Sequence, residues 1–591
     1  MKTIFFTLYI LLSFAIYADI TTTASSVLEN KERYSHKNVI DGDIFTAWSE
    51  GAPKEGINEW VQLDFGEEKD LFYLGIIPGY TKYNDKVGEV WFKNHRVKEA
   101  KLVFSDQSSI DIELIDKQKI QYFKINKKTS YVKLIIKDTF KGSTWQDTCT
   151  SEIKPIFDSI DDLRGDIHFD QESILTSTNT VYALLELQAP FQQPSIRDPL
   201  NLCLVIDQSG SMQEGNKMNY VKEAAKLILG SLDEQDTLSI IGYDDTPYTY
   251  YPSTKLTKGQ KNNIVAAIDT MYAMGGTNIS DALLAGIYSI NTSKDSQQVK
   301  NIFLLSDGIA TSGDTRSFVI ENHAFAAKKK HNISISAFGV GENYNEDLLS
   351  SLADVSMGSY YYIQNPRQIF MNLHSEISNL KTIAFKNMML DVDIPEGFEL
   401  ETVFGYNANV SKKSVNIQLP PLQLGEKKYV LLKLKKAAKT KPSLFDAVLS
   451  KQSQDLSFTL NGKLKAFNKL SNKTFSTNIS KTLPQSTGSS SDTTPYYDQI
   501  LKILSAQKLS NAIGAYKKGN QSDALLKLKT HIETLKKDNE FLKSPVLDRE
   551  IRILSDILSN LKTTSPNSAD GNILIKASKL RAINILKGDE T

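Results

Sequence analysis

The region that most constrains the fold runs from residue 198 to about 383, where short apolar segments alternate with amphipathic ones. NLCLVI, TLSIIGY, NIFLLS and ISISAFGV have the length and composition of buried strands. Between them, KMNYVKEAAKLILGSL and NISDALLAGIYSI carry apolar residues at helical spacing. This alternation predicts a doubly wound α/β domain, with helices on both faces of a parallel sheet. Binding sites in such sheets form at the carboxyl ends of the strands.

The segments on either side predict different folds. Residues 19–153 contain short alternating strands separated by turns, as in a β sandwich or jelly roll. Strand patterns also occur at 165–197 and at 384–480. A linker rich in Ser, Thr and Gly is expected at 481–495, followed by a helical bundle over 496–591. The chain is therefore expected to be a multidomain protein.

The N-terminus has the layout of a secretory signal peptide. Lys2 precedes an apolar run from Ile4 to Tyr17, and Ala18 is a small residue at a plausible cleavage point. The run is shorter than the roughly 20 residues that span a bilayer, and no later stretch is apolar and long enough. We expect residues 1–18 to be removed and the mature chain, without a transmembrane segment, to be secreted, periplasmic or at the cell surface.

Charge and histidine content exclude some functions. The 69 Lys and Arg residues balance 69 Asp and Glu residues, so the chain has no electrostatic reason to bind nucleic acid. The seven histidines are scattered and form no His-Glu-x-x-His motif, which argues against a zinc hydrolase. We expect a protein that is not an enzyme.

The first strand of the α/β region ends in the polar motif VIDQSGSM (205–212). A phosphate-binding loop would need Gly-Lys-Ser/Thr, but Asn216 stands before the lysine and Met218 takes the hydroxyl position. A nucleophilic Asp207 would need a proton donor two residues on, where Ser209 is a poor acid. Neither phosphate binding nor nucleophilic catalysis therefore fits this motif.

A metal site remains, because Asp207, Ser209 and Ser211 alternate along an extended loop and offer oxygen ligands to a hard cation. Magnesium prefers six oxygens in an octahedron, so three residues are too few. Thr277 in GGTN and Asp307 in FLLSDG lie at a loop-to-helix junction and a strand end, respectively. The sequence predicts that these five residues converge on one divalent cation.

The motifs VIDQSGSM, GGTN and LLSDG resemble those of the von Willebrand factor A domain over about 198–380. The resemblance implies a metal-ion-dependent adhesion site that holds Mg²⁺, Mn²⁺ or Ca²⁺. Its two serines and its threonine would bind through hydroxyls, and its aspartates partly through water. A cation held mostly by neutral hydroxyls stays electrophilic, so the expected partner is a protein that presents an Asp or Glu carboxylate. The implied ligands are Asp207, Ser209, Ser211, Thr277 and Asp307.

The flanking β segments, together with DGIATSGDT and VGENYNEDLL, are similar to the arrangement in inter-α-trypsin-inhibitor heavy chains. That resemblance implies a β sandwich built from 165–197 and 384–480 around the A domain.

The N-terminal region resembles the discoidin (galactose-binding-like) superfamily, in the version found in NADase-type glycan-binding modules. The resemblance rests on ASSVLENKERYSHKNVIDGDIFTAWSEG and the closing DTCTSEI. It implies a structural calcium ion, for which oxygen ligands from a loop and a distant strand are suitable. The alternative is a turn in which the aspartates bond only backbone amides. The implied ligands are Asp41, Asp43, Thr46 and Glu152.

Aromatic residues of the same region raise a second functional hypothesis. Tyr34, Tyr80 and Trp91 could stack on the sugar rings of a cell-surface glycan, although such residues, and Trp48 in particular, more often fill a sandwich core. The leading hypothesis is an exported, metal-dependent protein-binding or adhesion protein. The alternative is a carbohydrate-binding surface protein in which the A domain is a scaffold.

Overall fold

The computed structural model describes most of the chain beyond the expected signal peptide. Residues 1–18 lie outside the described residues, which are 20–42, 46–53, 55–81, 83–84, 88–116, 120–157, 162–175, 178–191, 198–292, 298–341, 344–363, 368–437, 458–469, 471–484, 494 and 496–588. The chain forms two compact units. One comprises the residues up to Asp162 together with 190–192, and the other comprises 163–189 and 193–591.

The first unit is β-rich. Its main sheet has the order β1-β3-β8-β6-β9-β2, with β10 paired to β3 and β7 paired to β6. Pairing is antiparallel except between β6 and β9. The elements are β1 Thr21–Ala24, η1 Leu28–Asn30, η2 Glu32–Tyr34, η3 His36–Val39, β2 Trp48–Ser49, β3 Trp60–Ile77, β4 Tyr83–Asn84, β5 Gly88–Glu89, β6 His95–Phe104, β7 Ser109–Glu113, β8 Gln121–Phe140, β9 Thr148–Thr150 and β10 Glu152–Ile156.

The core of the first unit follows from alternation along its long strands. Val61, Leu63 and Phe65 of β3 point to one face, as Val132 and Leu134 of β8 do, because successive strand residues alternate in direction. Trp48 is fully buried in the same core, as the sequence suggested. Strand β10 extends three residues beyond the expected domain end at 153.

The second unit begins with two sheets that share one core, built from segments on both sides of the α/β region. One sheet has the order β11-β12-β24-β20 and the other β21-β22-β19-β25-β26, with β23 on β19. The strands are β11 Arg164–Phe169, β12 Thr180–Gln188, β19 Ile383–Asp393, β20 Phe398–Val403, β21 Ala408–Val410, β22 Ser414–Leu419, β23 Leu422–Gln423, β24 Lys427–Lys436, β25 Phe458–Asn468 and β26 Lys473–Leu483.

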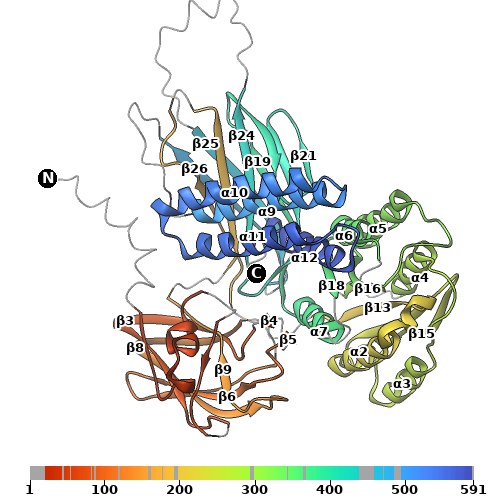
Figure 1. Ribbon diagram of the computed structural model, residues 1–591, viewed down its shortest axis with the longest axis horizontal. Coiled ribbons are helices and arrows are strands. Elements are labelled where there is room, and N and C mark those ends of the chain that lie inside the picture. Colours follow the sequence, from red (N-terminus) through yellow and green to blue (C-terminus); the bar gives the residue numbers. More distant parts are fainter. Residues whose placement is uncertain are drawn as a thin grey trace, which may run out of the picture. The chain divides into compact units, whose positions relative to one another are not determined.

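Along the chain, the α/β domain expected from the sequence comes between β12 and β19, and most of its helices and strands are labelled in Figure 1. Its sheet has the order β15-β14-β13-β16-β17-β18, parallel except for the edge strand β15. Helices α2, α3 and α7 share one core with the sheet, and α4, α5 and α6 share the other. The elements are β13 Leu200–Asp207, η4 Gly210–Asn216, α2 Lys217–Ser231, β14 Thr237–Tyr243, β15 Pro247–Lys255, η5 Lys258–Gln260, α3 Lys261–Asp269, α4 Ile279–Asn291, β16 Val299–Ser306, α5 Ser317–His331, β17 Ser334–Val340, α6 Glu346–Ser356, β18 Tyr360–Ile363 and α7 Gln368–Lys381.

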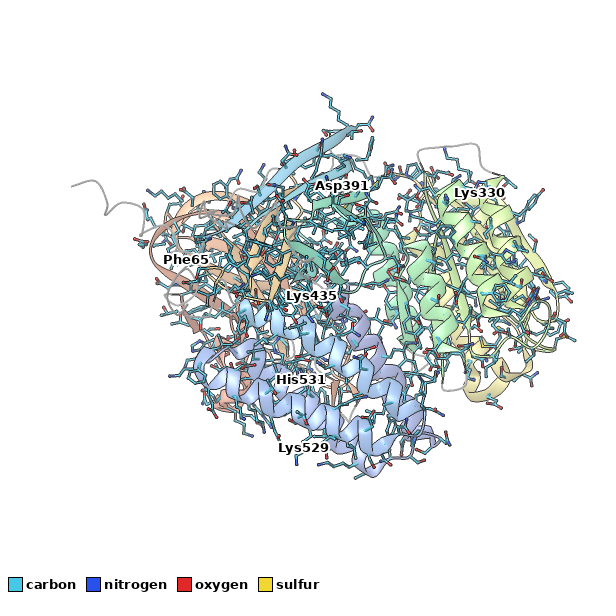
Figure 2. The ribbon with its side chains drawn as sticks, turned by 90° about the horizontal axis from the view of Figure 1, so that it is seen from above. Phe65, Lys330, Asp391, Lys435, Lys529 and His531 are labelled. Carbon is cyan, nitrogen blue, oxygen red and sulfur yellow. The ribbon has the colours of Figure 1, made fainter. Side chains whose placement is uncertain are left out.

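The C-terminal helices pack on the β sandwich. Leu184 of β12 and Leu431 of β24 face away from the sandwich core and join the helical core. On α10, His531 Nε2 lies 2.8 Å from Ser505 Oγ, whereas Lys529 is exposed (Figure 2). The helices are α9 Tyr497–Lys517, α10 Gln521–Leu542, α11 Pro545–Thr563 and α12 Ala569–Leu586.

An acid–lysine network joins the α/β domain to these helices. It consists of two acidic residues at the start of α6 and three lysines of α9 and α12: Glu346, Asp347, Lys517, Lys576 and Lys579. Lys576 Nζ donates to Glu346 Oε2 at 3.0 Å and to the backbone oxygen of Tyr344 at 2.9 Å. Lys517 bonds both acidic residues, and Lys579 bonds Asp347.

Two expectations about the C-terminal third need adjustment. Strand β26 runs to Leu483, so it includes the first residues of the segment expected to be a linker, and most of the remaining linker lies outside the described residues. The helices share their core with β12 and β24 rather than forming a bundle by themselves, because both faces of that sheet are apolar. In the part of the chain that the structure describes, no helix has the length and apolarity to cross a bilayer.

Candidate cation site

The candidate site lies at the carboxyl ends of the adjacent strands β13 and β16. Ile206 pairs with Leu305 in the parallel register, so the next carboxylates along each strand, Asp207 and Asp307, emerge at the same edge of the sheet. In the sheet, β14 pairs with one side of β13 and β16 pairs with the other side. The edge is therefore the switch point at which doubly wound sheets bind ligands.

Asp207 is completely buried and is held by three donors. The Ser209 N–H donates to its Oδ1 at 2.8 Å, and the hydroxyls of Ser306 and Tyr243 donate to its Oδ2 at 2.8 and 3.3 Å. Burial raises the pKa of the Asp207 carboxyl to about 6, and the charge of Asp307 acts in the same direction, against the Ser209 hydrogen bonds. These bonds fix the orientation of the carboxylate.

The hydroxyls of the two serines and the second carboxylate come together. Ser209 Oγ and Ser211 Oγ are 3.1 Å apart, and the Ser211 hydroxyl donates to Asp307 Oδ1 at 2.7 Å. The Gly210 N–H donates to the backbone oxygen of Gly275 at 3.1 Å, which brings the GGTN loop beside the serine loop. Donation to Asp307 leaves the lone pairs of Ser211 Oγ available to a cation.

Thr277 is held next to the Asp307 loop. Its N–H donates to Thr311 Oγ1 at 2.9 Å, and its backbone oxygen accepts from the N–H groups of Thr311 and Ser312. A Cβ added at Gly308 would lie 3.2 Å from Thr277 Oγ1, so a larger residue at 308 would press on this hydroxyl. The structure thus brings Thr277 to the loop that carries Asp307. These five residues form the oxygen cluster: Asp207, Ser209, Ser211, Thr277 and Asp307.

The donor set of the oxygen cluster fits a small divalent cation. Neighbouring ligands of an octahedral magnesium ion lie about 3.0 Å apart, given metal–oxygen distances near 2.1 Å. The separations of 3.1 Å between the serine oxygens and 2.7 Å between Ser211 and Asp307 bracket that value. The described residues contain no group of three or more His, Cys, Asp or Glu side chains that could hold a metal ion. The oxygen cluster differs from such a group because it combines two carboxylates with three hydroxyls.

Three residues of the site were not assigned a role from the sequence. Ser306 and Tyr243 bond Asp207, and Lys217 Nζ bonds Asp307 Oδ2 at 2.6 Å. Ser306 belongs to the LLSDG motif, which is a sequence signal for its place beside the site. Local spacing gives no sign that Lys217 reaches Asp307, which lies 90 positions away in the chain.

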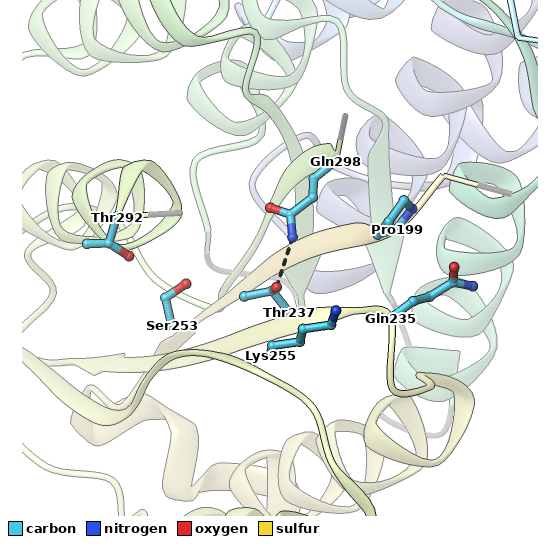
Figure 3. A pocket seen from close by; sticks show the side chains of 7 residues that line it. All are labelled: Pro199, Gln235, Thr237, Ser253, Lys255, Thr292 and Gln298. Carbon is cyan, nitrogen blue, oxygen red and sulfur yellow. Dashed lines mark hydrogen bonds between the residues drawn. The ribbon is translucent and has the colours of Figure 1, made fainter. Parts of the chain in front are cut away.

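A cavity of about 280 Å³ lies at the opposite end of the same sheet (Figure 3). Gln298 Nε2 donates to Thr237 Oγ1 at 3.0 Å within it. Lys255 is the charged group of its lining, which contains no carboxylate, so the cavity does not resemble a cation site. The lining residues are Pro199, Gln235, Thr237, Ser253, Lys255, Thr292 and Gln298.

In the first unit, the aromatic residues proposed to stack on sugars are largely inaccessible. Trp91 is 1% exposed and its Nε1 donates to Asp116 Oδ1 at 2.9 Å, while Tyr80 is 9% exposed. Tyr34 is half-buried against the small core that contains Tyr80. Burial of two of the three rings corrects their proposed sugar-stacking role, since a buried ring presents no face to a ligand.

The calcium ligands expected in the first unit are only partly described. The Thr46 hydroxyl donates to Asp41 Oδ2 at 2.7 Å. Glu152 lies on β10 and is buried, whereas Asp43 lies outside the described residues. A calcium ion at this turn stays a prediction.

The parallel sheet and the helices on both of its faces define a doubly wound α/β domain, with the oxygen cluster at its switch point. Residues 201–375 match the von Willebrand factor type A domain, so the chain contains a domain of this family. Residues 13–156 match the NAD glycohydrolase translocation F5/8 type C domain, in agreement with the discoidin-like resemblance of the N-terminal region. The chain thus joins an F5/8 type C domain to a von Willebrand A domain.

Curated relatives match about a third of this chain. Human inter-alpha-trypsin inhibitor heavy chain H2 is 30% identical over 209 residues, which cover 34% of this chain and 22% of that protein. The uncharacterized protein sll0103 of Synechocystis is 32% identical over 199 residues, or 34% of this chain and 46% of that protein. The alignments therefore span less than half the length of these relatives.

Similarity of fold extends further than similarity of sequence. A von Willebrand factor type A structure from Catenulispora acidiphila superposes with a TM-score of 0.54 at 14% identity, covering 73% of this chain and 97% of that one. At this identity the match concerns the fold alone.

Proposed function

We propose that the chain is an exported, non-enzymatic protein that binds a partner protein through a divalent cation held by the oxygen cluster. The preferred cation is Mg²⁺, with Mn²⁺ or Ca²⁺ as substitutes. The partner supplies an Asp or Glu carboxylate as a further ligand. The signal-like N-terminus supports export, and the von Willebrand A domain supports a role in protein interaction, which is typical of this family.

The observation that carries the proposal is that Ser211 Oγ lies 3.1 Å from Ser209 Oγ and 2.7 Å from Asp307 Oδ1. Hydroxyl ligands neutralise little of the charge of a divalent ion. A cation in such a site keeps an affinity for anionic oxygen, and magnesium commonly leaves positions to water that a carboxylate can replace. Ser211 is part-exposed, whereas the other four members of the cluster are buried, so an incoming group would reach the site on the side of Ser211.

Two measurements test the proposal. Calorimetric titration of the mature chain with Mn²⁺ should show one site, lost in Ser211→Ala and retained in Ser253→Ala, a matched change at the opposite end of the sheet. A peptide array in which each Asp or Glu has an Asn or Gln counterpart should then show binding to acidic peptides in Mg²⁺ and none in EDTA. Peptide binding that is equal in Mg²⁺ and EDTA would contradict the proposal.

A further inference from the structure

Lys217 places a positive charge directly against the oxygen cluster. It is the first residue of α2 and follows Gly215 and Asn216, whose left-handed backbone (φ 59° and 64°) turns the chain at this point. Its Nζ donates to Asp307 Oδ2 at 2.6 Å and to the backbone oxygen of Ser211 at 3.3 Å. The Asp307 side chain is 0% exposed, so the ammonium compensates a carboxylate that water does not reach.

This ammonium changes the charge that a cation meets. With both aspartates ionised, two carboxylates and one ammonium leave one net negative charge, whereas the cluster without Lys217 would carry two. Affinity of oxygen sites for divalent cations is tuned by the number of charged ligands. Lys217 should therefore weaken cation binding, and it should leave the bound cation with more uncompensated charge for an external carboxylate.

We infer that Lys217 is a positioning residue that sets both how tightly this site binds the cation and how tightly the bound cation holds a partner. Its ammonium holds Asp307 in place and compensates it in cation-free protein, lowers the affinity for the divalent cation, and strengthens the hold of the bound cation on an acidic ligand. The inference rests on the proposed function, because it takes the oxygen cluster as the cation site.

The test replaces Lys217 with a neutral side chain of similar length, Lys217→Met, in the mature chain. Mn²⁺ titrated by calorimetry should bind about tenfold more tightly, since one nearby like charge is removed. In EDTA the melting temperature should fall, because the buried Asp307 carboxylate loses its ammonium partner and keeps the Ser211 hydroxyl, and Mn²⁺ should restore it. Binding of an acidic peptide at saturating Mg²⁺ should weaken. A purely structural role for Lys217 would lower the Mn²⁺ affinity instead.

Three further variants separate charge from shape. Lys217→Arg keeps the charge and should keep the wild-type Mn²⁺ affinity, while Lys217→Gln, also neutral, should repeat the Lys217→Met result. Lys226→Met removes another lysine of the same helix, about 13 Å along its axis, and should leave Mn²⁺ affinity unchanged. A loss of melting temperature in EDTA that Mn²⁺ does not restore in either neutral variant would overturn the inference.

The outcomes distinguish the inference from the function on which it rests. If the wild type binds Mn²⁺ and the neutral variants bind no more tightly, the role of Lys217 is wrong and the cation site stands. If only the neutral variants bind Mn²⁺, the role of Lys217 is supported and the proposed function of the natural chain is wrong. If none binds Mn²⁺, both are wrong.

Discussion

Two acidic pairs of the same α/β domain differ in how their charges are compensated. Asp207 and Asp307 in the oxygen cluster meet one ammonium, from Lys217, and several hydroxyls. Glu346 and Asp347 in the acid–lysine network meet three ammonium groups from the C-terminal helices. With both aspartates ionised, the first pair has one more negative charge than positive, as the proposed cation site requires, whereas the second pair meets more ammonium groups than it has carboxylates.

The pKa values of Asp207 in the first pair and Glu346 in the second are shifted in opposite directions. Burial raises the pKa of Asp207 to about 6, with Asp307 adding to the effect. Burial alone would also raise the pKa of Glu346, but the hydrogen bond from Lys517 and the charge of Lys576 outweigh it, and the pKa is lowered. The number of lysines therefore distinguishes the acidic pair that we propose as a cation site from the pair that joins two parts of the fold.

The largest expected effect is on stability, from Lys576→Met in the acid–lysine network. Lys576 is 3% exposed and bonds Glu346, so its removal leaves a buried carboxylate with Lys517 as its remaining partner. We expect the free energy of unfolding to fall by about 2–4 kcal/mol, measured by urea denaturation.

The matched control for this variant is Lys579→Met, three residues along the same helix. Its partner Asp347 is exposed, so the free energy of unfolding should fall by less than about 1 kcal/mol. Equal losses in the two variants would contradict the distinction between a buried and an exposed partner.

Cation addition should separate the two acidic pairs directly. Mg²⁺ at a hundredfold excess over its Kd should stabilise the wild type by about 2.7 kcal/mol relative to EDTA. Ser211→Ala should lose this stabilisation, whereas Glu346→Gln should retain it because its carboxylate belongs to the acid–lysine network. Thermal unfolding in Mg²⁺ and in EDTA measures both, and a loss in Glu346→Gln would show that the pairs are coupled.

Acid should weaken the acid–lysine network. The pKa of Glu346 is lowered from its ordinary value of 4.5, so the folded state holds the ionised form more strongly than the unfolded state does. Its contribution to stability is present above about pH 4.5 and is lost as the pH falls below that value. The difference in melting temperature between wild type and Glu346→Gln should therefore shrink with falling pH, and a constant difference would contradict this role.

The smallest expected effect comes from Thr277→Ser in the oxygen cluster. The hydroxyl is retained and one methyl group is lost, so Mn²⁺ affinity should change by about threefold or less. Thr277→Val removes the hydroxyl at similar volume and should weaken binding clearly more. Equal calorimetric affinities of the two variants would remove Thr277 from the ligand set.

Local patterns in the sequence determined much of this protein. Alternating apolar segments predicted the α/β domain, because a buried parallel strand and an amphipathic helix each have a distinct period. Motif spacing also predicted that Asp207, Ser209, Ser211 and Asp307 would meet, since the carboxyl ends of adjacent parallel strands share an edge. These inferences need only the order of elements along the chain.

Only the tertiary structure decided which charges and faces meet at long range. Lys217 bonds Asp307 across 90 positions, and Glu346 bonds Lys576 across 230. Likewise, Trp91 is buried and Leu184 faces the C-terminal helices, although neither residue type reveals which way it points. The physical reason is that the spacing of side chains along one helix or strand depends on that segment alone. The partner of a side chain depends on how separate segments pack together.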